Sequence, residues 1–326
     1  MYNPIFLKKY FSRLSTLLFF MFFAKLTFAV GEIKNTPIDF TDLKKYALLS
    51  DAAYNTPEEI QKQLKSTNYR LSHYGNIADI EISYFLATND IDKNQVISVR
   101  GTSNVENAFV DIALKLLLDK HTGIRLHNGF SLAAEKVYKA IQTKIKPGYT
   151  LSTTGHSLGG AVALILAMHL DTDKVKIDQV VTFGQPKVTN VAGANKFEHL
   201  KIIRLVTPRD LVPLVPPFDP VDLNNIDIYW HLGKEIVLLE NKNYAVLEGV
   251  NSMLRATRFT QEALSEKNLH NHKMTLYIKL LNDKIPNAKQ VPYKNNFNLF
   301  NLFGSRYQVI PSIKVVNEAA AATVRI

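Results

Sequence analysis

The sequence predicts one α/β domain, and three observations support this fold class. Apolar runs of strand length alternate with stretches of helical periodicity between residues 30 and 285. No glycine- or serine-rich linker interrupts these residues, so one large domain is favoured over two small ones. The chain has 326 residues, 46% of them hydrophobic and 21% charged, which is enough apolar material for a sizeable core.

The first 29 residues have the pattern of a secretory signal peptide. Three basic residues, Lys8, Lys9 and Arg13, precede an apolar run, and Ala29 ends a small-residue cleavage site. Lys25 interrupts the apolar run, which is shorter than the roughly 20 residues that a membrane-spanning helix needs. We therefore expect cleavage after residue 29 and export, to the periplasm or the medium, with a retained N-terminal membrane anchor as the alternative.

The composition excludes several kinds of site. The sequence has no cysteine, which excludes disulfides, thiolate zinc sites, a cysteine nucleophile and lipid attachment through cysteine. The formal net charge is +10, and removal of residues 1–29 takes away four basic residues and leaves +6. This mild excess favours anionic lipid surfaces but lacks the dense basic stripe of a nucleic-acid-binding protein.

Short apolar runs predict the core strands, and one longer apolar run predicts a buried helix. Strand-like runs are rich in valine, isoleucine and threonine, whereas one run is almost wholly apolar at helical length. In order, we expect a strand over 95–100, a helix over 125–143, a strand over 149–154, a buried helix over 158–170, and core strands over 180–183 and 202–206. From Pro286 asparagine and phenylalanine interleave, so 286–326 is expected to be a C-terminal extension, docked or partly disordered.

A G-x-S-x-G pentapeptide, Gly155-His156-Ser157-Leu158-Gly159, connects the strand predicted over 149–154 to the helix predicted over 158–170. A strand before a serine and a helix after it are the context of a nucleophile elbow, where the serine is exposed on a sharp turn. The glycines allow strand and helix to pass closely, and the helix N-terminus favours a developing negative charge. The alternative is a chance serine at a helix N-cap.

A nucleophilic serine needs a base and an acid that orients the base, and in this arrangement they follow it in the order acid, then histidine. Asp210 comes just after the strand predicted over 202–206, which suits the acid, although a turn aspartate is the alternative. Asp171, Asp173 and Asp178 are weaker candidates because they precede that strand.

Three histidines follow Asp210. His270 and His272 lie in a polar segment, 266–273, which we expect to be a loop before a helix over 274–281. His231 lies beside a predicted strand, where a structural hydrogen bond is the simpler explanation. We rank His272 first, His270 second and His231 third as the base.

The oxyanion of an acyl-transfer intermediate needs two backbone N–H donors. The residue after the serine, Leu158, supplies one, and Thr102, in the loop after the strand over 95–100, is the natural second. In the segment 104–120 that follows, apolar residues recur at helical spacing. This segment is either a lid over the site or an ordinary helix packed on the sheet.

Several blocks in this order resemble the class 3 lipases, a family with the α/β-hydrolase fold. The resemblance covers about residues 40–282 and rests on seven blocks: Ala47–Tyr54, Ser98–Ser103, His127–Phe130, Gly155–Gly160, Thr182–Val188, Asp210–Pro213 and Asn271–Met274. It implies a mostly parallel central sheet with helices on both faces. It also implies Ser157, Asp210 and His272 as nucleophile, acid and base, and a non-catalytic position for His231. Two departures are Asn271, where an acidic residue is common, and Thr189, where glycine is frequent.

The resemblance implies a secreted serine hydrolase that cleaves carboxylic esters of lipids, as a triacylglycerol lipase or a phospholipase A1. Its substrate would be a lipid ester at a membrane or emulsion surface, with peripheral membrane contact, and no cofactor, metal or nucleic acid is expected. The alternatives are a carboxylesterase for soluble esters and a catalytically inactive hydrolase-fold protein that binds lipid or a partner.

Overall fold

The computed structural model describes residues 37–65, 67–102, 115–216, 228–256 and 265–293. The chain divides into two units, Met1–Asp39 and Phe40–Ile326, and the helices and strands of the described ranges belong to the second unit. The predicted signal peptide, 1–29, and the end of the predicted extension, from 294, lie outside the described residues. None of the helices within the described ranges has the length and hydropathy to cross a membrane.

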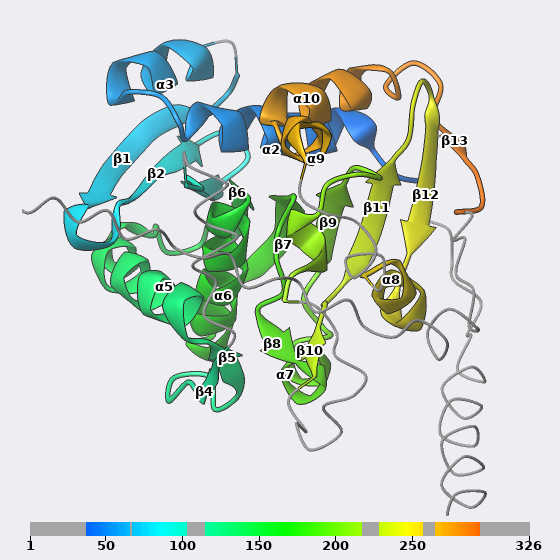
Figure 1. Ribbon diagram of the computed structural model, residues 1–326. Coiled ribbons are helices and arrows are strands. Elements are labelled where there is room, and N and C mark those ends of the chain that lie inside the picture. Colours follow the sequence, from blue (N-terminus) through cyan, green and yellow to red (C-terminus); the bar gives the residue numbers. More distant parts are fainter. Residues whose placement is uncertain (1–36, 66, 103–114, 217–227, 257–264, 294–326) are drawn as a thin grey trace, which may run out of the picture. The chain divides into compact units, whose positions relative to one another are not determined.

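The main sheet has nine strands, and its five central strands, β3, β6, β7, β9 and β11, run parallel (Figure 1). At one end β2 is antiparallel to β3 and β1 is antiparallel to β2, and at the other end β12 is antiparallel to β11 and parallel to β13. The strands in sheet order are β1 (Arg70–Ile77), β2 (Ile82–Asn89), β3 (Asn94–Val99), β6 (Thr150–His156), β7 (Ile177–Phe183), β9 (Ile202–Val206), β11 (Lys234–Leu238), β12 (Asn243–Leu247) and β13 (Lys289–Gln290). The predicted α/β class with a mostly parallel sheet is confirmed.

Helices cover both faces of this sheet. Successive residues of a strand point to opposite faces, and on β6 Ser152 accepts a hydrogen bond from Tyr46 of α2 (Phe40–Ala52). The next residue, Thr153, donates to the Ala163 carbonyl of α6 (Leu158–Thr172). α2 and α6 therefore lie on opposite faces.

The remaining helices pack beside these two or at the ends of strands. In Figure 1, α5 lies against α6, and α10 lies against α2. The helices other than α2 and α6 in the described ranges are α3 (Pro57–Leu64), α5 (Asn128–Ile141), α7 (Val191–Lys196), α8 (Gly249–Ala256), α9 (Glu266–Asn271) and α10 (Met274–Asn282). The 3₁₀ turns are η1 (Ala78–Ile80), η2 (Gln142–Lys144) and η3 (Val212–Leu214). α6 is buried from Gly159 to Leu170, which confirms the predicted buried helix.

A second, four-stranded antiparallel sheet explains two wrong predictions. It contains β10 (Tyr229–Trp230), β8 (Thr189–Asn190), β5 (Arg125–His127) and β4 (Leu116–Leu118) in that order. The helix predicted from residue 125 begins three residues later, because 125–127 pair with β4 and β8 and His127 caps α5. Leu116 lies in β4, so the helical spacing expected over 104–120 does not extend to it; residues 103–114 of that segment lie outside the described part.

The prediction of a loop over 266–273 was also wrong in part, because α9 occupies Glu266–Asn271. Ser265 and Asn268 form a capping box: each side chain accepts a hydrogen bond from the backbone N–H of the other. This pairing stabilises a helix too short and polar to show a hydrophobic period. At the start of the predicted extension, Lys289 pairs with Asn243 of β12, so β13 joins the sheet edge.

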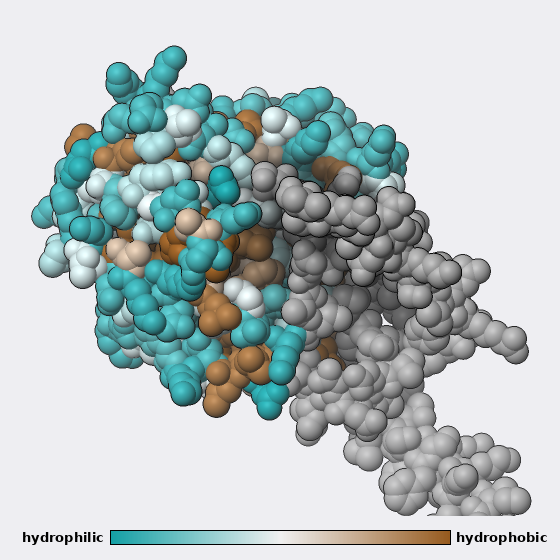
Figure 2. Space-filling view, turned by 60° about the vertical axis from the view of Figure 1, so that its left-hand side comes forward, coloured by the Kyte–Doolittle hydropathy of each residue, from teal (hydrophilic) through white to brown (hydrophobic). Residues whose placement is uncertain are grey.

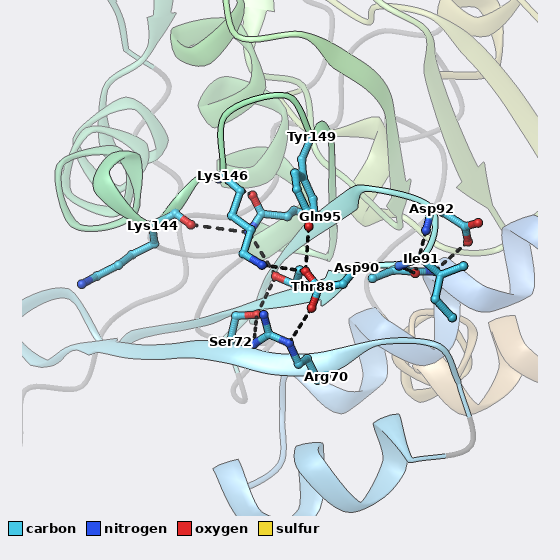
Figure 3. Close-up of polar contacts among 11 residues, drawn as sticks. Arg70, Ser72, Thr88, Asp90, Ile91, Asp92, Gln95, Lys144, Lys146 and Tyr149 are labelled. Atoms are coloured by element: carbon cyan, nitrogen blue, oxygen red, sulfur yellow. Dashed lines mark hydrogen bonds and ion pairs between the residues drawn. The ribbon is translucent and has the colours of Figure 1, made fainter.

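A polar cluster fixes the chain where it enters β6 (Figure 3). Asp90, after β2, accepts hydrogen bonds from Arg70 of β1 and from Lys146 and Tyr149, which precede β6. The buried Gln95 of β3 accepts from the Lys146 amide at 2.7 Å and donates to Thr88. These contacts hold the start of the strand that carries the serine candidate.

A buried charge cluster joins the last strands of the sheet to α8. The carboxylate of Glu235 in β11 forms ion pairs with Arg204 of β9, at 3.0 Å, and with Arg255 of α8. The Ser252 hydroxyl donates a hydrogen bond to the same carboxylate. All four side chains are buried. Burial raises the pKa of Glu235, but Arg255 and Arg204 lower it by more, so the group stays ionised.

We expect Glu235→Gln to lower the free energy of unfolding by about 3–5 kcal/mol, because it leaves two buried guanidinium groups without a countercharge. Urea unfolding of the purified chain measures this loss. Glu135→Gln is the control: Glu135 pairs with Lys139 on the exposed face of α5, and its loss should cost at most about 1 kcal/mol. Similar small losses in both variants would contradict a central role for the buried cluster.

Candidate active site

Ser157 occupies a sharp turn between β6 and α6. Its backbone has φ 59° and ψ −133°, a conformation that non-glycine residues rarely adopt. A Cβ on Gly159 would collide with the carbonyl oxygen of Val99 and lie 2.6 Å from the carbonyl carbon of Arg100. A Cβ on Gly155 would lie 2.5 Å from the carbonyl group of Gly159. Strand and helix therefore meet at backbone contact, as the sequence predicts for a nucleophile elbow.

Asp210 and His272 meet at the carboxyl edge of the sheet, although 62 residues separate them. Asp210 follows β9, and its Oδ2 lies 2.8 Å from His272 Nδ1; both side chains are buried. Tyr277 donates to the same oxygen at 2.6 Å, and the Val212 amide donates to Oδ1 at 2.9 Å. Three donors thus compensate the burial of this carboxylate.

The hydrogen bond to Asp210 determines which nitrogen of His272 can accept a proton. A carboxylate oxygen accepts, so His272 Nδ1 carries the hydrogen and Nε2 is the basic nitrogen. Nε2 is buried, and within the described ranges it has no hydrogen-bond partner. This is the tautomer that a histidine base requires.

Gly184, directly after β7, brings the serine and the acid–histidine pair together. Phe183, just before it, accepts a hydrogen bond from the Ser157 amide at 2.8 Å. Gly184 has φ +58°, and a Cβ there would lie 2.8 Å from both Asp210 Oδ2 and His272 Nδ1. Only a residue without a side chain fits this position. The sequence signals Gly184 only through the block Thr182–Val188, because its role depends on neighbours far along the chain.

The predicted oxyanion loop lies against the serine. A Cβ on Gly101 would lie 3.1 Å from Ser157 Cβ and 2.5 Å from the His156 carbonyl oxygen. Thr102 follows directly and is half-buried, and Leu158 begins α6 on the other side of the serine. Thr102 and Leu158 thus flank Ser157, and the α6 N-terminus adds its positive dipole end.

The other candidate acids and histidines lie away from Ser157 or form hydrogen bonds with a structural role. Asp171 and Asp173 are at the far end of the 15-residue α6 and bind His199 and His121, and Asp178 is at the start of β7. His270 is exposed on α9. His231 is buried and its Nε2 lies 2.6 Å from the Pro213 carbonyl. Burial, reinforced by Arg204, lowers the pKa of His231 well below its usual value, so it is a neutral structural donor.

No cluster of three or more histidine, aspartate or glutamate side chains that could hold a metal occurs within the described ranges.

Fold and site together define a protein of the α/β-hydrolase class, and the comparisons with known proteins specify it further. Residues 96–219 match the family described as lipase (class 3). A secreted mono- and diacylglycerol lipase 1 from Fusarium solani is 32% identical over 176 residues, 51% of this chain and 51% of that protein. The chain spans about half the length of the curated relatives it matches.

Solved structures give the same result. Lipase II from Rhizopus niveus is 25% identical, with a TM-score of 0.53 over 62% of this chain and 81% of its own. A triacylglycerol lipase whose catalytic centre is formed by a serine protease triad is 26% identical, with a TM-score of 0.53 over 62% of this chain and 80% of its own. This chain is therefore similar to the class 3 lipases over residues 96–219 and shares their α/β-hydrolase fold.

We expect Gly159→Ala to lower the free energy of unfolding by about 1–3 kcal/mol or more, because its new Cβ must displace the Val99–Gly101 backbone. Gly129→Ala is a matched control, since Gly129 has the same second position in α5 and a Cβ there meets its nearest neighbour at 3.6 Å. That change should leave stability unchanged or raise it by up to about 1 kcal/mol. Urea unfolding of both variants measures the difference, and equal stabilities would refute the close approach at the elbow.

Proposed function

We propose that this chain hydrolyses carboxylic esters of lipids, with Ser157 as nucleophile, His272 as base and Asp210 as the acid that orients the base. The observation that carries the proposal is the buried Asp210–His272 pair, 2.8 Å apart, in which the other ring nitrogen of the histidine, Nε2, has no hydrogen-bond partner within the described ranges. Gly184 packs this pair against the strand end that holds the Ser157 amide.

The reaction proceeds in two steps. Ser157 Oγ attacks the ester carbonyl while His272 Nε2 takes its proton, and the N–H groups of Leu158 and Thr102 donate to the oxyanion. The imidazolium returns the proton to the departing alcohol, which leaves an acyl-enzyme. Water then attacks the acyl group by the same route and releases the fatty acid. Asp210 stabilises the imidazolium, and Tyr277 holds the carboxylate in place.

Four observations support a lipid substrate. The relatives are named as lipases, one for mono- and diacylglycerols and one for triacylglycerols. β4, which follows residues 103–114, exposes Leu117 and Leu118, with 40% and 67% of their surface accessible. The face in Figure 2 is mainly hydrophilic, with hydrophobic side chains gathered in a few patches. The net charge of +6 after removal of residues 1–29 adds an attraction to anionic lipid surfaces.

We also propose that the chain is exported. The charged and apolar pattern of residues 1–29 and the secreted relative from Fusarium solani support this.

The test compares the purified chain with Ser157→Ala on a triacylglycerol emulsion and on phosphatidylcholine with distinguishable acyl chains. Ser157→Ala should lower the rate of fatty-acid release at least about 10³-fold, because the acyl-enzyme can no longer form. Ser72→Ala, which removes a hydroxyl on β1, is the control and should keep full activity. Identification of the released acids distinguishes an acylglycerol lipase from a phospholipase A1, which releases the sn-1 chain.

Two outcomes would replace the proposal. Serine-dependent cleavage of a soluble short-chain ester alone would make the chain a carboxylesterase. If neither lipid nor soluble ester is cleaved, the chain is a hydrolase-fold protein that binds lipid or a partner.

A further inference from the structure

A row of hydrogen bonds connects α2 and the turn after it to β6. It joins every fourth residue of the helical segment to every second residue of the strand: Tyr46 to Ser152 at 3.1 Å, Ser50 to Thr154 at 2.8 Å and Tyr54 to His156 at 2.8 Å. Four helical residues advance about 6 Å and two strand residues about 6.6 Å, so the two spacings match. The last of these bonds reaches the residue directly before Ser157.

His156 continues this row to the candidate base. Its Nε2 lies 2.6 Å from the backbone carbonyl oxygen of His272, which can only accept. Burial lowers the pKa of His156 well below its usual value, and the neighbouring His272 lowers it further, so the ring is neutral and has one hydrogen. That hydrogen is on Nε2, and Nδ1 therefore accepts the hydrogen of the Tyr54 hydroxyl.

Tyr54 also contacts the predicted oxyanion loop. Burial raises the pKa of its hydroxyl, and a hydrogen bond from the Gly101 backbone opposes that rise in part. A Cβ on Gly101 would lie 2.5 Å from the Tyr54 hydroxyl oxygen, which confirms how closely the loop approaches. The Tyr54 oxygen thus accepts from Gly101 and donates to His156.

We propose that Tyr54 and His156 are positioning residues of the hydrolase proposed above, on which this inference rests. A hydrogen-bonded bridge runs from the Gly101 amide through the Tyr54 hydroxyl and the His156 ring to the His272 carbonyl. Ser157 lies beside this bridge, next to both Gly101 and His156 in space. The bridge holds the oxyanion loop and the backbone of the base at a fixed distance from each other. Neither side chain takes part in the bond-making steps.

The test compares Tyr54→Phe with Tyr46→Phe. Both variants lose one hydroxyl that bonds from the α2 segment to β6, but only Tyr54 belongs to the bridge. Tyr54→Phe should lower kcat about five- to fiftyfold and leave KM within about twofold, because one hydrogen bond to a buried group is lost at each end. Tyr46→Phe should change kcat by less than about twofold. A merely structural role predicts that both variants lower Tm alike and leave kcat alike.

Two variants of His156 test whether a substitute N–H donor preserves kcat. Gln at this position keeps an N–H donor for the His272 carbonyl, whereas Leu has none. His156→Gln should therefore retain at least about tenfold more kcat than His156→Leu. Equal kcat in these two variants, or in Tyr54→Phe and Tyr46→Phe, would overturn the proposal.

Amide hydrogen exchange gives a readout that does not require activity. In Tyr54→Phe the Gly101 amide loses its acceptor, so the segment 98–102 should exchange at least about fivefold faster than in Tyr46→Phe. If the unaltered chain shows no hydrolysis that depends on Ser157, the proposed function fails. Exchange then still decides on the bridge: faster exchange supports it, and equal exchange in the two variants overturns it.

Discussion

The turn at Ser157 is the constraint on which the rest of the site depends. A serine with φ 59° is strained by about 1–3 kcal/mol, and it persists only where its surroundings leave no alternative. Here both neighbouring strands of β6 supply those surroundings: the end of β3 packs on Gly159, and Phe183 of β7 binds the Ser157 amide. The ends of β3 and β7 and the start of α6 thus hold the serine in this conformation.

The acid and the base reach this turn from the end of β9 and from the residue after α9. Each depends on a buried polar contact rather than on its own element: Tyr277 and Val212 donate to Asp210, and Gly184 leaves room for the pair. Buried polar groups of this kind are stable only when all of them are satisfied. Among the side-chain polar atoms of Asp210, His272 and Tyr277, only Nε2 of His272 has no hydrogen-bond partner within the described part of the chain, which makes it an informative exception.

The sequence predicts most where the signal is local. The apolar run of α6 and the strand Ile202–Val206 were expected at these positions. The order of serine, acid and histidine together with local context ranked Asp210 and His272 first, and their catalytic roles stay predictions. Residues 125–127 form a strand because they pair with residues 116–118 and because Leu126 also pairs with Thr189, a partner too far along the chain for a local pattern to show. Tyr54 is similar: its partner His156 is 102 residues away.

The matched spacing between the α2 segment and β6 limits how the length of this protein can change. One residue inserted between Tyr46 and Tyr54 would turn the following side chains about 100° around the helix axis. One residue inserted between Ser152 and His156 would send the ring of His156 to the opposite face, toward α6. Length variation is therefore tolerated in connections such as the β11–β12 turn, while these two segments can differ in residue type but not in residue number.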